Sequence, residues 1–259
     1  MKGHIERGYF GGIFFEFALQ NRNADAIIIL PDFPSRNKYD SLISFFYNRG
    51  YHVFVPRYRG SYQSNGKFLS KNVVDDLSLF VDDLEKGQVK SLWDMKKKEF
   101  KINRKLLIGH SFSGPIALGL AAKSPRFSHI ILMSPIWDFS KYKPEGEEND
   151  LKKISEFVQR AYKNCYRYTF KDMVKKLNKF KELNSEFYLQ PLIKTPILVM
   201  HDPNDKIVPF KYTKEKLGEL QNATYIEHLL GHKFTDSLIN SHWQMIDKFI
   251  KINYFEKRD

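Results

Sequence analysis

Continuous runs of apolar residues recur along most of this chain, separated by segments with a different periodicity. Such runs, rich in β-branched residues, are typical of strands buried on both faces of a sheet. Shorter strands are expected around Gly11 and Gly12, including Phe14–Ala18. The longer runs are Ala26–Leu30, His52–Pro56, Lys105–Ile108, His129–Met133, Pro196–Met200 and Ala223–His228.

Between these runs, apolar residues recur every three or four positions, which predicts helices that bury one face. The helices are expected at Asp40–Tyr47, Val73–Leu84, Pro115–Ala122 and Ile239–Ile252. Strands alternating with helices indicate an α/β fold with a mostly parallel sheet and helices on both faces. Functional residues are then expected on loops at the carboxyl edge of the strands.

One long interval, between Met133 and Pro196, breaks the alternation. Apolar residues follow helical spacing from 154 to 165 and again from 170 to 180, so we expect helices there. We divide the chain into a core, residues 1–135 and 196–259, and a helical cap inserted at 136–195. A long crossover carrying a surface helix pair is the alternative.

Composition narrows the classes of protein. Lys and Arg exceed Asp and Glu by 42 to 30, giving a net charge of +12, and 42% of the residues are hydrophobic. This is an ordinary globular composition, and the length fits one large domain with or without an insertion. The lysines are scattered and no nucleic-acid-binding motif is present, so we expect a solvated basic surface and no nucleic-acid partner; binding to an anionic membrane or to nucleic acid is the alternative.

The single cysteine, Cys165, cannot form an intramolecular disulfide, so a cytoplasmic protein is expected. No run approaches the ~18 apolar residues of a membrane span. Residues 1–12 carry charges and lack the apolar core of a signal peptide, which gives the same expectation.

The stretch Leu106–Gly114 carries the clearest chemistry. A buried strand runs directly into a helix, and Ser111 stands at the junction between small neighbours, Gly109 and Ser113. A sharp turn of this kind raises a serine hydroxyl above the sheet edge, and the helix N-terminus favours negative charge there. The alternative is a serine that only caps the helix.

A nucleophilic serine needs a base that is oriented by an acid. His232 follows the last strand in the segment Leu-Gly-His-Lys-Phe, and His228 is the rival base. For the acid, Asp205 stands in the loop after the strand at 196–200, and Asp138 and Asp202 are rivals. A metal site made of His201, Asp202, His228 and His232 matches no zinc-binding spacing, so no metal is expected.

These segments resemble the α/β-hydrolase superfamily, whose nucleophile motif is Gly-x-Ser-x-Gly; here Ser113 replaces the last glycine. His-Asp-Pro-Asn-Asp-Lys-Ile-Val-Pro resembles the superfamily's acid segment, His-Gly-x-x-Asp-x-x-Val-Pro, with Asp205 in the acid position. The resemblance implies a triad of Ser111, Asp205 and His232.

The oxyanion hole implied by the resemblance consists of two backbone N–H groups, those of Phe112 and Phe33. The superfamily often has His-Gly before the second donor, where this chain has Pro31 and Asp32. The missing His-Gly is the largest departure from the family pattern.

The loop at 57–67 resembles an Arg-Gly-x-x-x-Ser-x-Gly loop of serine aminopeptidase-like, prolyl-oligopeptidase-like and some esterase members. It could border the substrate pocket or serve as a structural loop tied together by Arg59. Tyr58, Tyr62 and Trp137 are the candidate substrate-binding residues.

The expected function is therefore that of a serine hydrolase which cleaves a small carboxylic ester through an acyl-enzyme, without a cofactor. Cleavage of short peptides is the alternative activity. A non-catalytic binding member of the fold is the alternative from another class.

Overall fold

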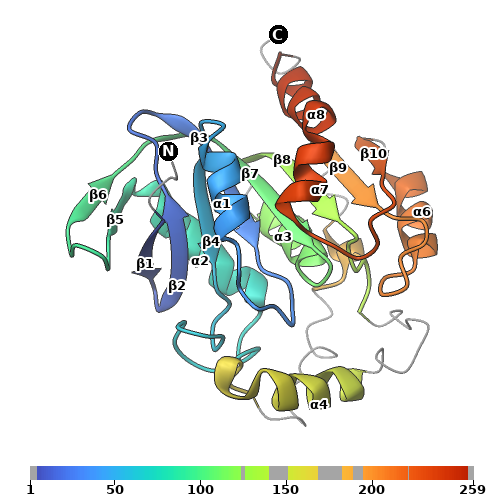
Figure 1. The fold of residues 1–259 in the computed structure, drawn as a ribbon, viewed down its shortest axis with the longest axis horizontal. Helices are drawn as coiled ribbons and strands as arrows, with labels where there is room; N and C mark the ends of the chain where they lie inside the picture. The colour runs from blue at the N-terminus through green and yellow to red at the C-terminus, as the bar shows by residue number, and fades with distance from the viewer. Residues whose placement is uncertain are drawn as a thin grey trace.

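An eight-stranded, mostly parallel sheet forms the centre of the molecule (Figure 1). The computed structural model describes residues 5–123, 126–139, 151–168, 183–188, 195–220 and 222–255. The strand order is β1-β2-β4-β3-β7-β8-β9-β10, with β1 and β2 antiparallel and all pairs from β4 to β10 parallel. The strands are β1 Glu6–Phe10, β2 Ile13–Ala18, β3 Ala24–Leu30, β4 His52–Pro56, β7 Ile102–His110, β8 Phe127–Met133, β9 Ile197–His201 and β10 Ala223–Glu227.

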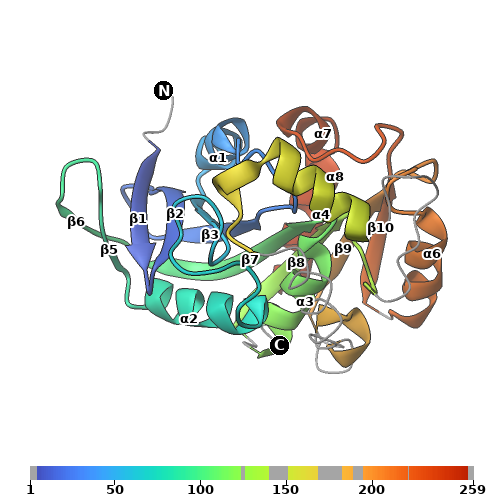
Figure 2. The ribbon, with the colours of Figure 1, turned by 90° about the horizontal axis from the view of Figure 1, so that it is seen from below.

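Helices cover both faces of this sheet, as Figure 2 shows for α1 and α7 on one side and α2 and α3 on the other. Side chains of β3 alternate between the two faces: Ile27 and Ile29 join the α1 side, whereas Ile28 joins the α2 side. The helices are α1 Asp40–Tyr47, α2 Val73–Glu85, α3 Ser113–Lys123, α4 Leu151–Ala161, α6 Phe210–Glu219, α7 Asp236–Ser241 and α8 Trp243–Phe255.

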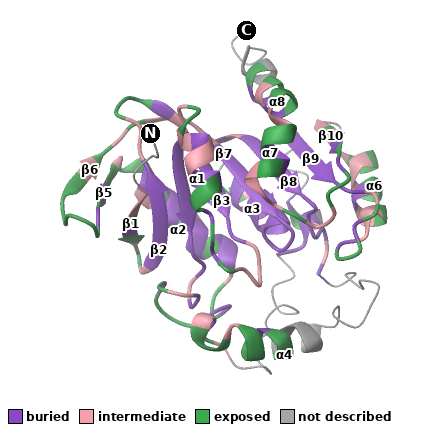
Figure 3. Cartoon of the chain, viewed as in Figure 1, coloured by how far each residue is buried: buried purple, intermediate pink, exposed green. Residues whose placement is uncertain are grey.

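The α/β architecture predicted from the sequence is confirmed, and the buried strands are the most deeply covered elements (Figure 3). The structure corrects one predicted helix and adds a hairpin that was not predicted. The closing helix expected at 239–252 is two helices, because the chain breaks at His242 between α7 and α8. The lysine-rich connector after α2 contains a small hairpin, β5 Gln88–Lys90 and β6 Lys97–Glu99.

The interval between β8 and β9 contains α4, which confirms the first of its two expected helices. The second, at 170–180, lies outside the described residues. The chain after α4 is bound to the loop that follows β4: Tyr62 N–H donates to the Cys165 carbonyl (2.6 Å), and Arg167 N–H to that of Gly60 (2.8 Å). This places the segment at the carboxyl edge of the sheet (Figure 1). That residues 136–195 as a whole form a cap stays a prediction.

None of the helices in the described part of the chain has the length and apolarity needed to span a bilayer.

Candidate active site

Ser111 stands at the sharp turn between β7 and α3, in a conformation that is uncommon for a residue with a side chain. Its φ is +51°, in the left-handed region. Neighbouring backbone holds it there, because Ser111 N–H donates to the Met133 carbonyl (3.0 Å) and its carbonyl accepts from Ile136 N–H (3.0 Å). This is a strained strand-to-helix turn of the kind expected for a nucleophile, and Ser111 is buried in it.

Close packing around the turn explains its small residues. A Cβ atom on Gly109 would lie 2.6 Å from the Ser113 carbonyl oxygen, and one on Gly114 would lie 2.5 Å from Cβ of Pro135. Ser113, in place of the usual glycine, is fully buried. Its hydroxyl lies 3.0 Å from the Leu30 carbonyl oxygen and accepts from His110 N–H (2.8 Å). The serine therefore ties the turn to the end of β3.

Asp205 and His232 form a hydrogen-bonded pair, although they come from loops after different strands. His232 Nδ1 lies 2.8 Å from Asp205 Oδ2. The other oxygen, Oδ1, accepts from the N–H groups of Ile207 (2.8 Å) and Val208 (3.0 Å), which fixes the carboxylate. The partner of His232 is thus Asp205, not Asp138 or Asp202. With Nδ1 donating to the carboxylate, Nε2 of His232 is left as the basic nitrogen.

A buried chain of polar side chains supports the acid from behind. Trp137 Nε1 donates to Thr213 Oγ1 (2.8 Å), and Thr213 Oγ1 lies 2.7 Å from His201 Nδ1. His201 Nε2 lies 3.3 Å from Asp205 Oδ2. Nε2 also lies 3.0 Å from the Val208 carbonyl oxygen, and because both of these oxygens only accept hydrogen bonds, the His201 proton is on Nε2. The sequence predicted that His201 supports the acid loop, and these contacts confirm it.

Asp202 stands where the family's acid segment has a glycine, and its contacts explain this replacement. Its Oδ2 accepts from Gly231 N–H (2.6 Å) and its Oδ1 from Asn204 N–H (2.7 Å). The first bond joins the acid loop to the residue directly before His232. An aspartate in the usual glycine position therefore holds the two loops together.

The environment of Asp205 keeps its carboxyl group ionised. Burial by itself would raise its pKa, but hydrogen bonds from His201 and His232, with the charge of His232 and the N–H of Val208, hold the pKa well below its ordinary value of 3.8.

We expect this carboxylate to stabilise the fold at neutral pH and to lose that effect in acid. Its pKa is lower in the folded than in the unfolded state, so its contribution is full above about pH 4 and declines as the pH falls toward the folded-state pKa. Urea unfolding of wild type and Asp205→Asn at pH 7 and pH 3 measures this. The difference in free energy of unfolding should be larger at pH 7, and an equal difference at both pH values would contradict the assignment.

The Asp205–His232 pair lies beside the turn that holds Ser111. The imidazoles of His232 and His110, the residue before Ser111, have ring centroids 4.7 Å apart. In the described part of the chain, no hydrogen bond joins the Ser111 hydroxyl to His232. Such contacts are often long in unliganded enzymes and shorten when substrate binds.

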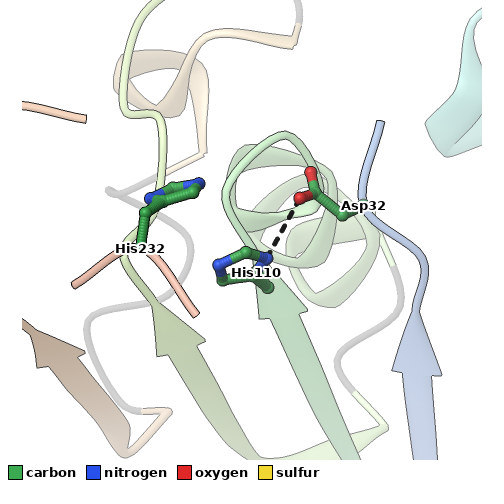
Figure 4. A group of neighbouring side chains, drawn as sticks. All are labelled: Asp32, His110 and His232. Atoms are coloured by element: carbon green, nitrogen blue, oxygen red, sulfur yellow. Dashed lines mark ion pairs between the residues drawn. The ribbon is translucent and has the colours of Figure 1, made fainter. Parts of the chain in front are cut away.

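The two N–H groups expected to form an oxyanion hole do converge on one point, but a carboxylate occupies it. Phe33 N–H donates to Asp32 Oδ1 (2.6 Å), and Phe112 N–H donates to the same oxygen (3.3 Å). The other carboxylate oxygen of Asp32 lies 3.1 Å from His110 Nδ1 (Figure 4). Sequence reasoning placed the donors and did not foresee the side chain between them.

Comparison with known proteins adds the family. Residues 34–186, more than half of the chain, match the family model described as serine aminopeptidase, S33. The chain belongs to this family of α/β hydrolases. No curated protein matches the sequence at a significant level.

Solved structures share the fold of this serine aminopeptidase family member. A serine hydrolase from Cycloclasticus zankles is 16% identical, with a TM-score of 0.68 over 96% of this chain and 99% of that one. An esterase from Exiguobacterium antarcticum is 14% identical, with a TM-score of 0.65 over 96% and 99%. A soluble variant of monoglyceride lipase from Saccharomyces cerevisiae is 16% identical, with a TM-score of 0.63 over 98% and 96%. At these identities the likeness establishes the fold.

In this family member, Asp32, His110 and His232 are a group, among the described residues, whose side chains face a common space (Figure 4). Their candidate ligand atoms lie within 4.8 Å of one another. The sequence analysis rejected a metal site made of His201, Asp202, His228 and His232. In the structure, His201 and Asp202 make the hydrogen bonds of the acid loop described above.

The candidate substrate-binding residues lie around the same loops, and their role stays a prediction. Tyr58 is buried, and its hydroxyl donates to the Pro31 carbonyl (2.7 Å). The hydroxyl of Tyr62 donates to the Ser35 carbonyl. Trp137 is buried with its indole on Thr213. All three therefore position the loops of the site.

Arg59 makes the structural contacts that were expected to tie the loop at 57–67 together. Its Nε donates to Asp76 Oδ1 (2.8 Å), and a guanidinium nitrogen reaches the Gly11 carbonyl (3.3 Å). The arginine therefore joins the loop to α2 and to the turn between β1 and β2.

Proposed function

We propose that this chain is a serine hydrolase that cleaves small carboxylic esters, with Ser111, His232 and Asp205 as its triad. The observation that supports it most is the Asp205–His232 hydrogen bond of 2.8 Å beside a serine held at φ +51°. A serine in a strained turn, a histidine with one free nitrogen and a fixed carboxylate are the parts that acyl transfer needs.

In the proposed mechanism, Ser111 Oγ forms a bond to the substrate carbonyl carbon while His232 Nε2 takes the hydroxyl proton. Asp205 stabilises the resulting imidazolium through Nδ1. The carbonyl oxygen becomes an oxyanion, which the N–H groups of Phe112 and Phe33 stabilise once it reaches them. As the C–O bond breaks, the alcohol leaves with the proton from His232. Water then attacks the acyl-enzyme with His232 again as base, which releases the acid and restores the serine.

An ester is the preferred substrate because it is the easier acyl donor. The names of the esterase and monoglyceride lipase of similar fold support the same choice. Short peptides are the second candidate, supported by the family description, serine aminopeptidase.

Labelling with a fluorophosphonate probe tests the nucleophile. Wild type and the exposed control Ser70→Ala should be labelled, Ser111→Ala should not, and mass spectrometry should locate the adduct on Ser111. Short and long p-nitrophenyl esters and aminoacyl anilides then separate esterase from peptidase. A folded wild type that reacts with neither the probe nor any substrate would favour the binding member of the fold.

A further inference from the structure

We propose that Asp32 is an autoinhibitory residue, whose carboxylate occupies the oxyanion hole and must leave it before an acyl group can be transferred. The inference rests on the proposed function, because it concerns the same Ser111 site. The usual residue of the superfamily in this position is a glycine, which has no side chain to place there.

Two hydrogen bonds and one close contact hold the carboxylate by its two oxygens. Oδ1 accepts from the N–H groups of Phe33 and Phe112, and Oδ2 lies 3.1 Å from Nδ1 of His110 (Figure 4). Phe112 directly follows the nucleophile, so its N–H is the donor that a tetrahedral intermediate requires. A charged oxygen that accepts from both donors is therefore in the place of the developing oxyanion.

The residues that carry the two N–H groups are closely packed, which disfavours their movement away from the carboxylate. The ring of Phe33 stacks on Phe68, with centroids 4.9 Å apart, and packs edge-on against Tyr166 at 4.9 Å and near Phe112 at 5.2 Å. The N–H of Asp32 donates to the Tyr39 hydroxyl (3.1 Å). The Asp32 side chain is 22% exposed, so rotation about its own bonds would bring the carboxylate into solvent without moving these rings.

Occupancy by an anion opposes catalysis in two ways. The carboxylate competes with the substrate carbonyl for the donors, and its negative charge repels the charge that develops on that oxygen. Loss of a single oxyanion-hole donor costs about 10²–10³-fold in kcat in serine hydrolases. Here two donors are engaged, so release of the carboxylate should produce a gain large enough to measure.

The experiment compares Asp32→Gly, Asp32→Asn and the exposed control Asp40→Asn with wild type. The readouts are the second-order rate of fluorophosphonate labelling and kcat/KM on p-nitrophenyl butyrate. We expect Asp32→Gly to raise both by at least tenfold, because the hole is then empty. Asp32→Asn should give a smaller gain, since the amide oxygen can still accept from both N–H groups without a full charge. Asp40→Asn should match wild type.

A folded Asp32→Gly that is labelled at or below the wild-type rate overturns the inference and leaves the proposed function intact. Absence of labelling in wild type and Asp32→Gly alike overturns the proposed function. A second measurement, independent of turnover, tests the inference separately from the proposed function and does not require the glycine variant to fold. In ¹⁵N-phenylalanine spectra, the amide protons of Phe33 and Phe112 should both lie further downfield in wild type than in Asp32→Ala, which has no side-chain oxygen to accept from them. Unchanged amide shifts would mean that the carboxylate is not in the hole, which also overturns the inference.

Discussion

Asp205→Asn is expected to lower kcat about 10⁴-fold without unfolding the protein, the scale of loss seen when a triad aspartate is replaced by its amide. The carboxylate accepts from His232 Nδ1 at 2.8 Å and therefore leaves Nε2 unprotonated. An amide nitrogen in that place donates to Nδ1 instead, which puts the imidazole proton on Nε2 and removes the base. His201 Nε2 lies 3.3 Å from the same oxygen, so in the variant it also meets an amide nitrogen in place of an accepting oxygen.

The measurement is kcat on the best ester found, with circular dichroism to confirm the fold. Asp75→Asn, an equal substitution at an exposed ion pair with Lys123, is the matched control and should retain wild-type activity. If folded Asp205→Asn keeps kcat within tenfold of wild type, another residue is the acid, and Asp138 becomes the first alternative to replace.

The second large effect is on stability: Glu16→Gln should destabilise the fold by about 3–5 kcal/mol. Glu16 Oε2 lies 3.1 Å from Arg57 Nη2, and the two side chains are only 6% and 9% exposed. Without the carboxylate, a buried guanidinium keeps its hydrogen bond to Gln63 but loses the charge that offsets its desolvation. Arg57 begins the loop at 57–67, so the damage reaches the site as well as the sheet.

Thermal and urea unfolding measure this loss, and a decrease in Tm of roughly 6–20 °C is expected for a chain of this size. Glu99→Gln removes the same charge from an exposed pair with Lys97, where the side chains are 73% and 59% exposed, and should leave Tm unchanged. Equal effects from the two substitutions would mean that the buried pair contributes no more than a surface pair.

The sheet and its helices could be predicted because their pattern is dense and periodic. β3, for example, is continuously apolar and packs on both faces, so its sequence permits few other structures. Elements with little buried surface escaped prediction. The hairpin β5–β6 buries Val89 among lysines, and α6 buries only Thr213 among its own residues. Their positions depend on contacts that are far apart in the sequence.

The candidate site was likewise predictable where the signal is local and unpredictable where it depends on contacts between distant residues. The strand-to-helix turn and the order of serine, aspartate and histidine are local signals, and the structure brings Asp205 to His232 as the sequence predicted. The orientation of Asp32 is not a local signal, because it depends on N–H groups from two separate loops and on His110. The replacement of His-Gly marked the position, but only the three-dimensional arrangement places a carboxylate between the donors.

The pairing of β8 with β9 bears on how the family can diversify. These strands are adjacent and parallel, with Ile130 opposite Ile197 and Met133 opposite Met200, yet the chain between them is long. The energetic cost of closing a loop grows slowly with its length, by about 0.6 kcal/mol for each doubling. Insertions and deletions at this point can therefore accumulate during evolution with little penalty, while the sheet that carries Ser111, Asp205 and His232 stays in register. New substrate preferences can arise there without any change in the three residues of the proposed triad.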